Sequence, residues 1–277
     1  MNTPPDLAAD IRRAVEQALA EDIGSGDLTA ALIPETATAE ARVLCLEQAV
    51  LCGCDWFNQT FAHLSDAINI NWQKQDGDRI NANEVVCRLN GPARALLSGE
   101  RTALNFLQLL SATATATRHT LEKMRPGKAK LLDTRKTIPG LRTAQKYAVR
   151  CGGGDNHRIG LYDAILIKDN HIKAAGGIDK AVSQAKADGV KVEVEVESLQ
   201  ELAEALQAGA DIILLDNFSL QDIKTAVTQG AGRAALEVSG NADAQSLPEL
   251  AATGVDYISI GALTKNIRAI DFSMLID

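Results

Sequence analysis

Two adjacent cations stand where an apolar run ends in the segment LLDTRKTIPGLR, residues 131–142. The run leads into Asp133, and Arg135 and Lys136 follow just before a Pro-Gly turn. Such side chains suit an anionic ligand, because the guanidinium fork matches two carboxylate oxygens and the ammonium is a compact cation. The segment therefore predicts an anion-binding site at the end of a strand.

More hydrogen-bond donors lie in CGGGDNHRIGLYDAILIKDNHI, residues 151–172. Three consecutive glycines permit close approach of the backbone, His157 and Arg158 follow them, and the next apolar run ends in Lys168. Arg135 and Arg158 together could clamp two carboxylates on one small ring, whereas either arginine alone could equally form a surface ion pair. His171, in the loop after Lys168, could shape the site or have no part in it.

The charge distribution also favours a small anionic ligand. The chain of 277 residues has a formal charge of −8, yet residues 135–173 hold eight Lys and Arg against three Asp. This segment is therefore +5 and the remainder −13. An acidic chain argues against nucleic acid or an anionic membrane as partner, since both favour a basic surface. The alternative is chance clustering of cations on solvated helix faces.

Neither the N-terminus nor the cysteines indicate secretion. The start, MNTPPDLAADIRR, lacks a basic region followed by an apolar one, and no apolar run approaches the ~18 residues of a membrane span. The five cysteines form no disulfide framework, and Cys52 and Cys54 are too close together for the usual structural zinc spacing. We expect a cytoplasmic protein with its thiols reduced.

The first third of the chain reads as mixed α/β. Leu7, Ile11, Val15 and Leu19 recur at helical spacing after Asp6. Strand-like runs follow at residues 41–53, 67–71 and 84–89, and the pattern then turns helical from Pro92 to about Met124, with a break expected near Ser111. These elements predict a mainly antiparallel sheet with helices.

From Lys130 onward, apolar strands alternate with helices. The strand runs are KLLD, AILIK, VKVEVEV, DIILLD, AALEVSG and DYISIG. Two of the helical patterns, 198–209 and 219–230, begin at Ser and end at Gly, the residues typical of helix caps. Six such units predict a parallel sheet covered by helices, most simply a β/α barrel. An open Rossmann-like sheet is the alternative, but no Gly-rich loop of that type follows a first strand.

Barrels of this kind bind ligands where their strands end. Here the strand runs end in Asp133 with Arg135 and Lys136, then in Lys168, Glu195, Asp216, Ser239 with Gly240, and Gly261. The turns at Ser239-Gly240 and at Gly261 could cradle a phosphate. Glu195 and Asp216 could hold sugar hydroxyls or Mg²⁺, directly or through water, or could pair with Lys168.

The segment VKVEVEVES, residues 190–198, alternates strictly. Four valines share one face, and Glu193, Glu195 and Glu197 share the other. In a barrel the valines would pack under helices and the carboxylates would point inward, where they need partners such as Lys136 and Lys168. An edge strand with one wet face is the alternative.

Taken together, these motifs resemble the quinolinate phosphoribosyltransferase family. The shared motifs are DTRKTIPGLR, KYAVRCGGGDNHRIGLYDAILIKDNHI, VEVEVES, IILLDNFS and YISIGALT, with EDIGSGDLT and SGERTALNFLQLLS nearer the N-terminus. The resemblance implies a type II phosphoribosyltransferase fold. In this α/β fold, residues 1–110 form a sandwich-like N-terminal domain on which residues 267–277 pack, and residues 111–266 form an incomplete, open α/β barrel.

The resemblance also implies the reaction. The phosphoribosyl group of phosphoribosyl pyrophosphate would pass to quinolinate with decarboxylation, a step of NAD biosynthesis, with Mg²⁺ bound alongside the pyrophosphate. It further implies a homodimer with a shared active site. Arg101 of the partner subunit would join Arg135, Lys136, His157, Arg158 and Lys168 around quinolinate.

By the same resemblance, Lys136, Lys168, Glu195 and Asp216 are the catalytic residues, and the two acidic ones face ribose and magnesium. Ser239, Gly240 and Gly261 would form the phosphate turns. Lys265 stands where some relatives have histidine, so a phosphate contact there is expected with altered geometry.

Three other functions fit parts of this pattern. A relative with the same fold, such as the molybdenum-operon homologue, would act on another substrate. A Schiff-base aldolase would use Lys168 at its strand end. A non-catalytic protein would bind the metabolite without releasing pyrophosphate.

Overall fold

The computed structural model describes residues 6–124, 127–187, 189–239 and 246–276. It divides into two compact units. We call the first the barrel unit, which holds His119–Lys136 and Gly154–Ala262. The second, the antiparallel unit, holds the described residues up to Arg118, Thr137–Gly153, and those from Leu263 onward.

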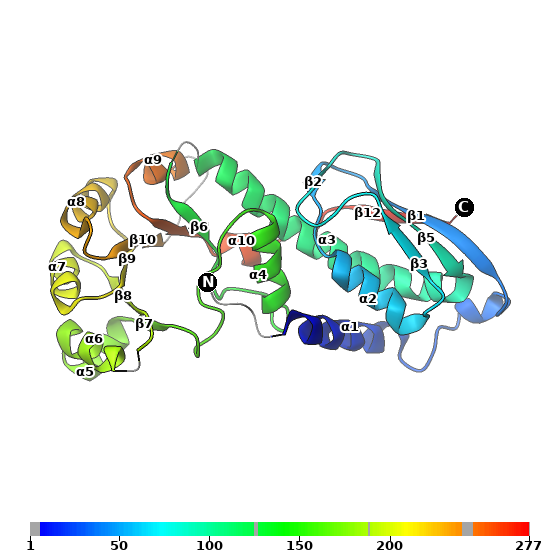
Figure 1. Cartoon of the computed structure of the whole chain (residues 1–277), viewed down its shortest axis with the longest axis horizontal. Coiled ribbons are helices and arrows are strands. Elements are labelled where there is room, and N and C mark those ends of the chain that lie inside the picture. The colour runs from blue at the N-terminus through cyan, green and yellow to red at the C-terminus, as the bar shows by residue number, and fades with distance from the viewer. Residues whose placement is uncertain (1–5, 125–126, 188, 240–245, 277) are drawn as a thin grey trace. The chain divides into compact units, whose positions relative to one another are not determined.

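The antiparallel unit is built on a four-stranded sheet in the order β12-β1-β5-β3 (Figure 1). These strands are β1 (Thr38–Cys45), β3 (Asn69–Trp72), β5 (Glu84–Pro92) and β12 (Phe272–Ile276). Residues 41, 43 and 45 of β1 are buried, as expected of a strand with one face on the core. Two short strands, β2 (Ala49–Val50) and β4 (Arg79–Ile80), form a separate antiparallel pair in the same unit. The mainly antiparallel sheet expected here is confirmed.

Helices complete this unit: α1 (Leu7–Ile23), η1 (Ala30–Leu32), α2 (Cys54–Leu64) and α4 (Arg142–Cys151). Asp6 caps α1, since its side chain accepts a hydrogen bond from Ala9 N. The predicted apolar stripe of α1 is buried, and Ile11 and Val15 pack in one core cluster with Trp56 of α2 and Ala148 of α4. The predicted N-terminal helix is therefore confirmed.

The long helix α3 (Ala93–Met124) runs without the break expected near Ser111. That expectation was wrong because the hydroxyl-bearing residues are packed rather than helix-breaking. Ser111 is fully buried, and its Oγ accepts a hydrogen bond from Cys52 N (3.0 Å) and donates one to Cys52 O (3.2 Å). Thr117 Oγ1 donates to the carbonyl of Thr113 one turn earlier (2.8 Å), which keeps the polar group within the helix.

In the barrel unit, six parallel strands form one sheet in the order β6-β11-β10-β9-β8-β7. They are β6 (Lys130–Leu132), β7 (Ile165–Ile167), β8 (Val192–Val196), β9 (Ile212–Asp216), β10 (Ala235–Ser239) and β11 (Tyr257–Ser259). β6 and β7 are the two ends of this order, so the sheet curves without closing. The six predicted strands and the open barrel are confirmed.

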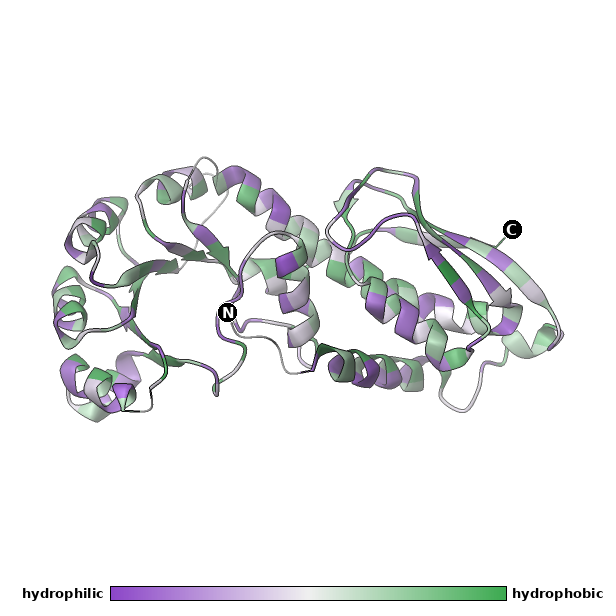
Figure 2. Cartoon of the chain, viewed as in Figure 1, coloured by the Kyte–Doolittle hydropathy of each residue, from purple (hydrophilic) through white to green (hydrophobic). Residues whose placement is uncertain are grey.

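Helices lie along the outer side of this curved sheet: α5 (Asp169–Ala175), α6 (Ile178–Lys186), α7 (Leu199–Ala208), α8 (Leu220–Gly230) and α9 (Leu247–Ala252) (Figure 1). Ser198 and Ser219 cap α7 and α8 as predicted, and Gly209 ends α7 in the left-handed conformation. Gly230, expected just beyond α8, is its last residue. Figure 2 shows mixed hydropathy on these helices and mostly hydrophobic colour along the strands, as a one-sided core requires.

The expected domain limits differ from the two compact units. Residues 111–118 and 137–153 belong to the antiparallel unit although the sequence suggested barrel for all of 111–266. The reason lies in α4, whose buried Ala144 and Ala148 join the core cluster of α1 and α2. The last helix, α10 (Ala262–Lys265), is also held there, because Gln145 Nε2 donates a hydrogen bond to Thr264 O (2.8 Å).

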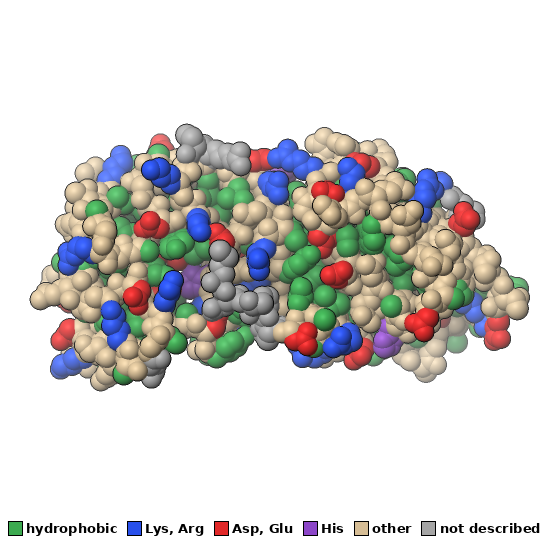
Figure 3. Space-filling view, viewed as in Figure 1, with side chains coloured by type: hydrophobic (Ala, Val, Ile, Leu, Met, Phe, Trp, Pro, Cys, Tyr) green, Lys and Arg blue, Asp and Glu red, His purple; other side chains and the backbone are tan. Residues whose placement is uncertain are grey.

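Acidic and basic side chains are interspersed on the face shown in Figure 3. None of the helices in the described parts of the chain combines the length and apolar character needed to cross a membrane.

Candidate active site

The strand-end residues of the barrel unit lie in register. Ser239 of β10 is level with Asp216 of β9 and with Ser259 of β11. Glu195 of β8 is level with Leu214, two residues before Asp216. The residues predicted from the strand ends therefore meet along one edge of the sheet, as parallel strands require.

Asp133 ties the glycine-rich segment to the end of β6. Its side chain is fully buried, Oδ1 accepts a hydrogen bond from His157 N (2.9 Å), and Oδ2 accepts one from Asn156 Nδ2 (2.6 Å). Asp155 runs beside Leu132 as a short parallel bridge, with Asp155 N donating to Leu131 O (2.8 Å). The loop that carries His157 and Arg158 is thus fixed against the strand that leads to Arg135.

The two predicted arginines are close enough to influence each other. Burial and the neighbouring Arg135 cation lower the pKa of Arg158. Arg158 donates one hydrogen bond to the carbonyl of Ala164 (3.4 Å), and Arg135 Nε is a buried donor without a hydrogen-bond partner among the described residues. Two neighbouring guanidinium groups of this kind could bind a dianion, because each fork matches the two oxygens of a carboxylate.

Lys136 lies against Gly261, which follows the end of β11. A Cβ at Gly261 would approach Lys136 Cδ to 2.9 Å and Thr134 Oγ1 to 3.3 Å. Glycine at this position therefore allows the turn after β11 to pack closely against residues 134–136. Ser239 is half-buried at the end of β10, and the predicted site residue Gly240 lies outside the described residues.

Lys168 forms an ion pair with Glu195, which is the partner predicted for this carboxylate. β8 lies between β7 and β9, so the alternative of an edge strand is wrong. The alternation of inward-facing glutamates ends with the strand. Glu197 is exposed, and its backbone N–H donates to Glu201 Oε2 (2.7 Å) at the start of α7. The expectation that Glu197 points into the barrel is wrong for that reason.

Glu195 and Asp216, on adjacent strands, are residues that could hold a magnesium ion carried by a substrate. Both carboxylates are half-buried at the ends of adjacent strands, and Asp216 Oδ2 accepts a hydrogen bond from Asn217 Nδ2 (3.1 Å). Mg²⁺ usually keeps several water ligands and takes one or two protein carboxylates beside substrate phosphates. Two carboxylates are enough for that role, since water and substrate phosphates would supply the other ligands.

The remaining predicted residues have other settings. His171 is exposed and forms a local cap for α5, because its Nδ1 accepts a hydrogen bond from Lys168 N (3.0 Å). Arg101 is exposed on α3, and Lys265 is exposed at the end of α10; both belong to the antiparallel unit. Their contact with substrate stays a prediction.

Glu237, which was not predicted from the sequence, joins the predicted residues Glu193 and His157 in an acidic cluster deeper in the barrel. Glu193 and Glu237 are buried inward-facing residues of β8 and β10, and both lie near His157 Nε2, at 3.0 and 3.7 Å. Burial and the Glu193 carboxylate raise the pKa of Glu237 to about 7. The signal in the sequence was strand alternation, since Glu237 precedes Ser239 by two residues and therefore shares its face.

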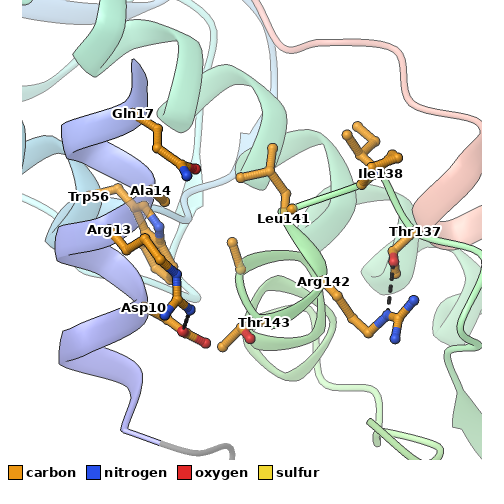
Figure 4. A pocket seen from close by; sticks show the side chains of 13 residues that line it. Asp10, Arg13, Ala14, Gln17, Trp56, Thr137, Ile138, Leu141, Arg142 and Thr143 are labelled. Carbon is orange, nitrogen blue, oxygen red and sulfur yellow. Dashed lines mark hydrogen bonds and ion pairs between the residues drawn. The ribbon is translucent and has the colours of Figure 1, made fainter. Parts of the chain in front are cut away.

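A separate cavity of about 310 Å³ lies in the antiparallel unit. Figure 4 shows its lining side chains, which include Arg13, paired with Asp10, and Arg142, whose Nε donates to Thr137 Oγ1 (3.2 Å). None of the predicted site residues lines this cavity. The candidate chemistry is therefore concentrated at the strand ends of the barrel.

The fold and this edge define a class, an open parallel α/β barrel with cationic side chains near the ends of its strands. Known proteins identify it further. Residues 27–111 match the family model for the N-terminal domain of quinolinate phosphoribosyl transferase, and residues 113–275 match that for its C-terminal domain. The chain therefore belongs to the quinolinate phosphoribosyltransferase family.

Individual relatives agree with this assignment. The probable carboxylating nicotinate-nucleotide pyrophosphorylase of Bacillus subtilis is 42% identical over 95% of this chain and 92% of its own length. The chloroplastic enzyme of that name from Arabidopsis thaliana is 37% identical over 99% of this chain and 85% of its own. The solved nicotinate-nucleotide pyrophosphorylase of Francisella tularensis superposes with a TM-score of 0.96 at 50% identity, covering 100% and 98% of the two chains.

Proposed function

We propose that this protein transfers the phosphoribosyl group of phosphoribosyl pyrophosphate to quinolinate, giving nicotinate mononucleotide, pyrophosphate and carbon dioxide. The observation that carries the proposal is the match of residues 27–111 and 113–275 to the two domains of this family, with Arg135 near enough to Arg158 to help lower its pKa. Quinolinate is a small ring with two adjacent carboxylates, and two guanidinium forks match two carboxylates. Family membership supports the same substrate.

The reaction needs no activated side-chain nucleophile. The pyridine nitrogen forms a bond to the anomeric carbon of ribose, while the bond from that carbon to pyrophosphate breaks and its electron pair leaves with pyrophosphate. Holding the two reactants in line turns this into an effectively unimolecular step. The residues of the strand-end edge supply the positioning.

Charge stabilisation would come from groups fixed before the reaction. Mg²⁺, when bound with the substrate, neutralises charge on the departing pyrophosphate. Lys136, packed along Gly261, would face the phosphate turns, and Asp216 and Glu195 would hold the ribose hydroxyls. Such preorganised groups stabilise charge that develops in the transition state.

Decarboxylation follows from the first step. Once ribosylated, the ring nitrogen is cationic, so it stabilises the carbanion that remains on the adjacent ring carbon when the carboxylate departs as carbon dioxide. The ring carbon then takes up a proton. The Lys168 ammonium, held by Glu195 at the strand end, would steady the negative charge during this step.

An aldolase is a weaker candidate on the same residue. A Schiff-base lysine must be neutral to attack a carbonyl, and its usual activation is desolvation or a neighbouring cation. Lys168 is instead paired with the Glu195 carboxylate and is partly exposed to solvent. Neither feature supplies the desolvation or the neighbouring cation that activates such a lysine.

The test supplies the purified protein with phosphoribosyl pyrophosphate, Mg²⁺ and quinolinate labelled in the 2-carboxylate, and measures labelled carbon dioxide and pyrophosphate together. We expect equal amounts of the two products and none of either when Mg²⁺ is removed with a chelator. Tight binding of quinolinate without pyrophosphate release would instead identify a non-catalytic binding protein.

A further inference from the structure

Three buried side chains meet inside the barrel beneath the strand-end edge. The side chains of His157, Glu193 and Glu237 are 12%, 6% and 1% exposed. His157 Nε2 lies 3.0 Å from Glu193 Oε2 and 3.7 Å from Glu237 Oε2. Burying two carboxylates beside one imidazole is costly unless the arrangement has a structural or chemical purpose.

The hydrogen bonds of this cluster define the histidine tautomer. His157 Nδ1 accepts a hydrogen bond from the backbone N–H of Arg158 (2.7 Å), so Nδ1 carries no proton. Nε2 must then carry it, and Nε2–H points to the Glu193 carboxylate. Both ring nitrogens are thus engaged within the protein, and the ring links the barrel interior to the backbone of Arg158.

The same segment is held from a second direction. Asp133 accepts the backbone N–H of His157 (2.9 Å), while Asn156 Nδ2 donates to the same carboxylate (2.6 Å). Asp133 therefore fixes the main chain before the arginine, and the Glu193 and Glu237 pair fixes the ring on which the Arg158 amide rests. An arginine so placed loses little freedom when it binds a planar carboxylate.

We propose that Glu193 and Glu237 are positioning residues for the substrate: they lock His157 in the Nε2–H tautomer and through it set Arg158 for one quinolinate carboxylate. This inference rests on the proposed function for its substrate. It also assigns His157 a part in holding Arg158, in addition to the substrate contact that the family resemblance implies.

A proton, rather than a metal ion, suits the space between the two carboxylates. Glu193 Oε1 and Glu237 Oε1 are both buried with no hydrogen-bond partner among the described residues. The nearby guanidinium groups already supply positive charge, and burial with the Glu193 carboxylate raises the pKa of Glu237 to about 7. A proton held between Glu237 and Glu193 would remove most of the repulsion between the two carboxylates.

The first test needs no variant. Protein labelled with ¹⁵N-histidine is studied by NMR at neutral pH, and the His157 resonances are assigned by their loss in His157→Asn. We expect a bare Nδ1 and a protonated Nε2. A protonated Nδ1, whether in the other tautomer or in an imidazolium, would overturn the proposal whatever the enzyme's substrate is.

The second test separates KM from kcat. Glu193→Leu removes the acceptor of Nε2–H, so we expect KM for quinolinate to rise about 10- to 100-fold, the usual effect of stranding a buried donor. KM for phosphoribosyl pyrophosphate should stay within about 2-fold, because Arg158 faces the other substrate. Glu193→Gln keeps an acceptor oxygen and should restore most of the loss, and Glu197→Leu, exposed just beyond the same strand, is the matched control.

Other outcomes would count against the proposal. Unchanged quinolinate KM in folded Glu193→Leu and Glu237→Leu proteins would remove both residues from positioning. If a metal ion co-purifies with the wild-type protein and is lost in Glu237→Gln, then a metal ion rather than a proton lies between the two carboxylates. Absence of any turnover with quinolinate would refute the proposed function, while the tautomer measurement would still decide the role of the two carboxylates.

Discussion

At the scale of single residues, the central feature is a pair of neighbouring guanidinium groups, since the Arg135 cation helps to lower the pKa of Arg158. Arg135 and Arg158 lie 23 residues apart in the sequence, and hydrogen bonds to Asp133 hold their two segments together. The nearby Asp133 and Glu193 carboxylates are buried, and each has one oxygen paired, with Asn156 Nδ2 and with His157 Nε2. The outer surface of the site can therefore stay cationic.

Replacing Arg158 by lysine tests whether the fork geometry matters and not only the charge. Arg158→Lys keeps a cation but loses the bidentate fork, so we expect kcat/KM for quinolinate to fall by about 10- to 100-fold. Steady-state kinetics with each substrate varied measures this. Arg150→Lys, on the exposed end of α4, is the control and should be unchanged; equal activity of both variants would remove the fork from recognition.

Glu237 gives the stability of the fold a dependence on pH. Its pKa is raised from 4.5 in the unfolded chain to about 7 in the folded protein, and the groups around it are Glu193, His157, Asp133 and Ser259, with Tyr257 in register on β11. The folded state therefore binds the carboxyl proton of Glu237 more tightly than the unfolded chain does. The stability that this protonation contributes is complete below about pH 4.5 and is lost as pH rises through 7.

The matched variant for this effect is Glu237→Gln, which cannot ionise. The difference in unfolding free energy between Glu237→Gln and wild type should grow by about 3 kcal/mol between pH 4.5 and 7.5, in favour of the variant at the higher pH. Urea titrations at several pH values measure it. A difference that does not change with pH would mean that Glu237 titrates normally in the folded protein.

At the scale of elements, α3 shows how tertiary contacts override a local expectation. Ser111 appeared to be a helix break, yet its hydroxyl supplies both hydrogen bonds that the backbone of Cys52 needs inside the core. Ser111→Ala leaves these groups buried and unpaired, so we expect a loss of about 1–3 kcal/mol in unfolding free energy. Chemical denaturation measures the loss.

An exposed position on the same helix provides the comparison. His119→Ala should change the unfolding free energy by less than about 0.5 kcal/mol, because His119 is exposed on α3. If Ser111→Ala is equally mild, the hydroxyl does not anchor the Cys52 segment.

Much of the barrel could be predicted from the sequence, for an identifiable reason. Its strands are short apolar runs, and the helices between them carry their own start and stop signals, such as Ser198 and Gly209. The strand ends also marked Lys168, Glu195 and Asp216, since a parallel sheet brings consecutive ends to one edge.

The features that escaped prediction depend on partners distant in the chain. Glu237 was overlooked because it lies two residues inside β10, and only its neighbours Glu193 and His157 make it significant. The place of α4 was also missed, since residues 137–153 interrupt the barrel sequence but pack on the core of the antiparallel unit. Local patterns do not report such contacts.

At the scale of the whole molecule, the family resemblance predicts a homodimer whose active site is completed by Arg101 of the partner subunit. Arg101 is exposed on α3, in the antiparallel unit, which fits a role outside its own barrel. Arg101→Ala and Arg135→Ala should each be nearly inactive with quinolinate. After the two variants are mixed, unfolded and refolded together, hybrid dimers should restore about a quarter of the wild-type activity.

The reason is that half of the dimers are then hybrids, and each hybrid has one site with neither substitution. Refolding either variant by itself is the control and should restore nothing. If the mixture also stays inactive although dimers form, Arg101 acts within its own subunit or not at all.

The central claim is that a cationic edge of the barrel selects a ring with two carboxylates. The most direct measurement is the ratio of kcat/KM for quinolinate to that for nicotinate, which lacks the second carboxylate. We predict a ratio above about 1,000, because a site built to bind a polar group strongly rejects the analogue that lacks it. A ratio near or below one would contradict the account and would favour a relative with this fold but another substrate.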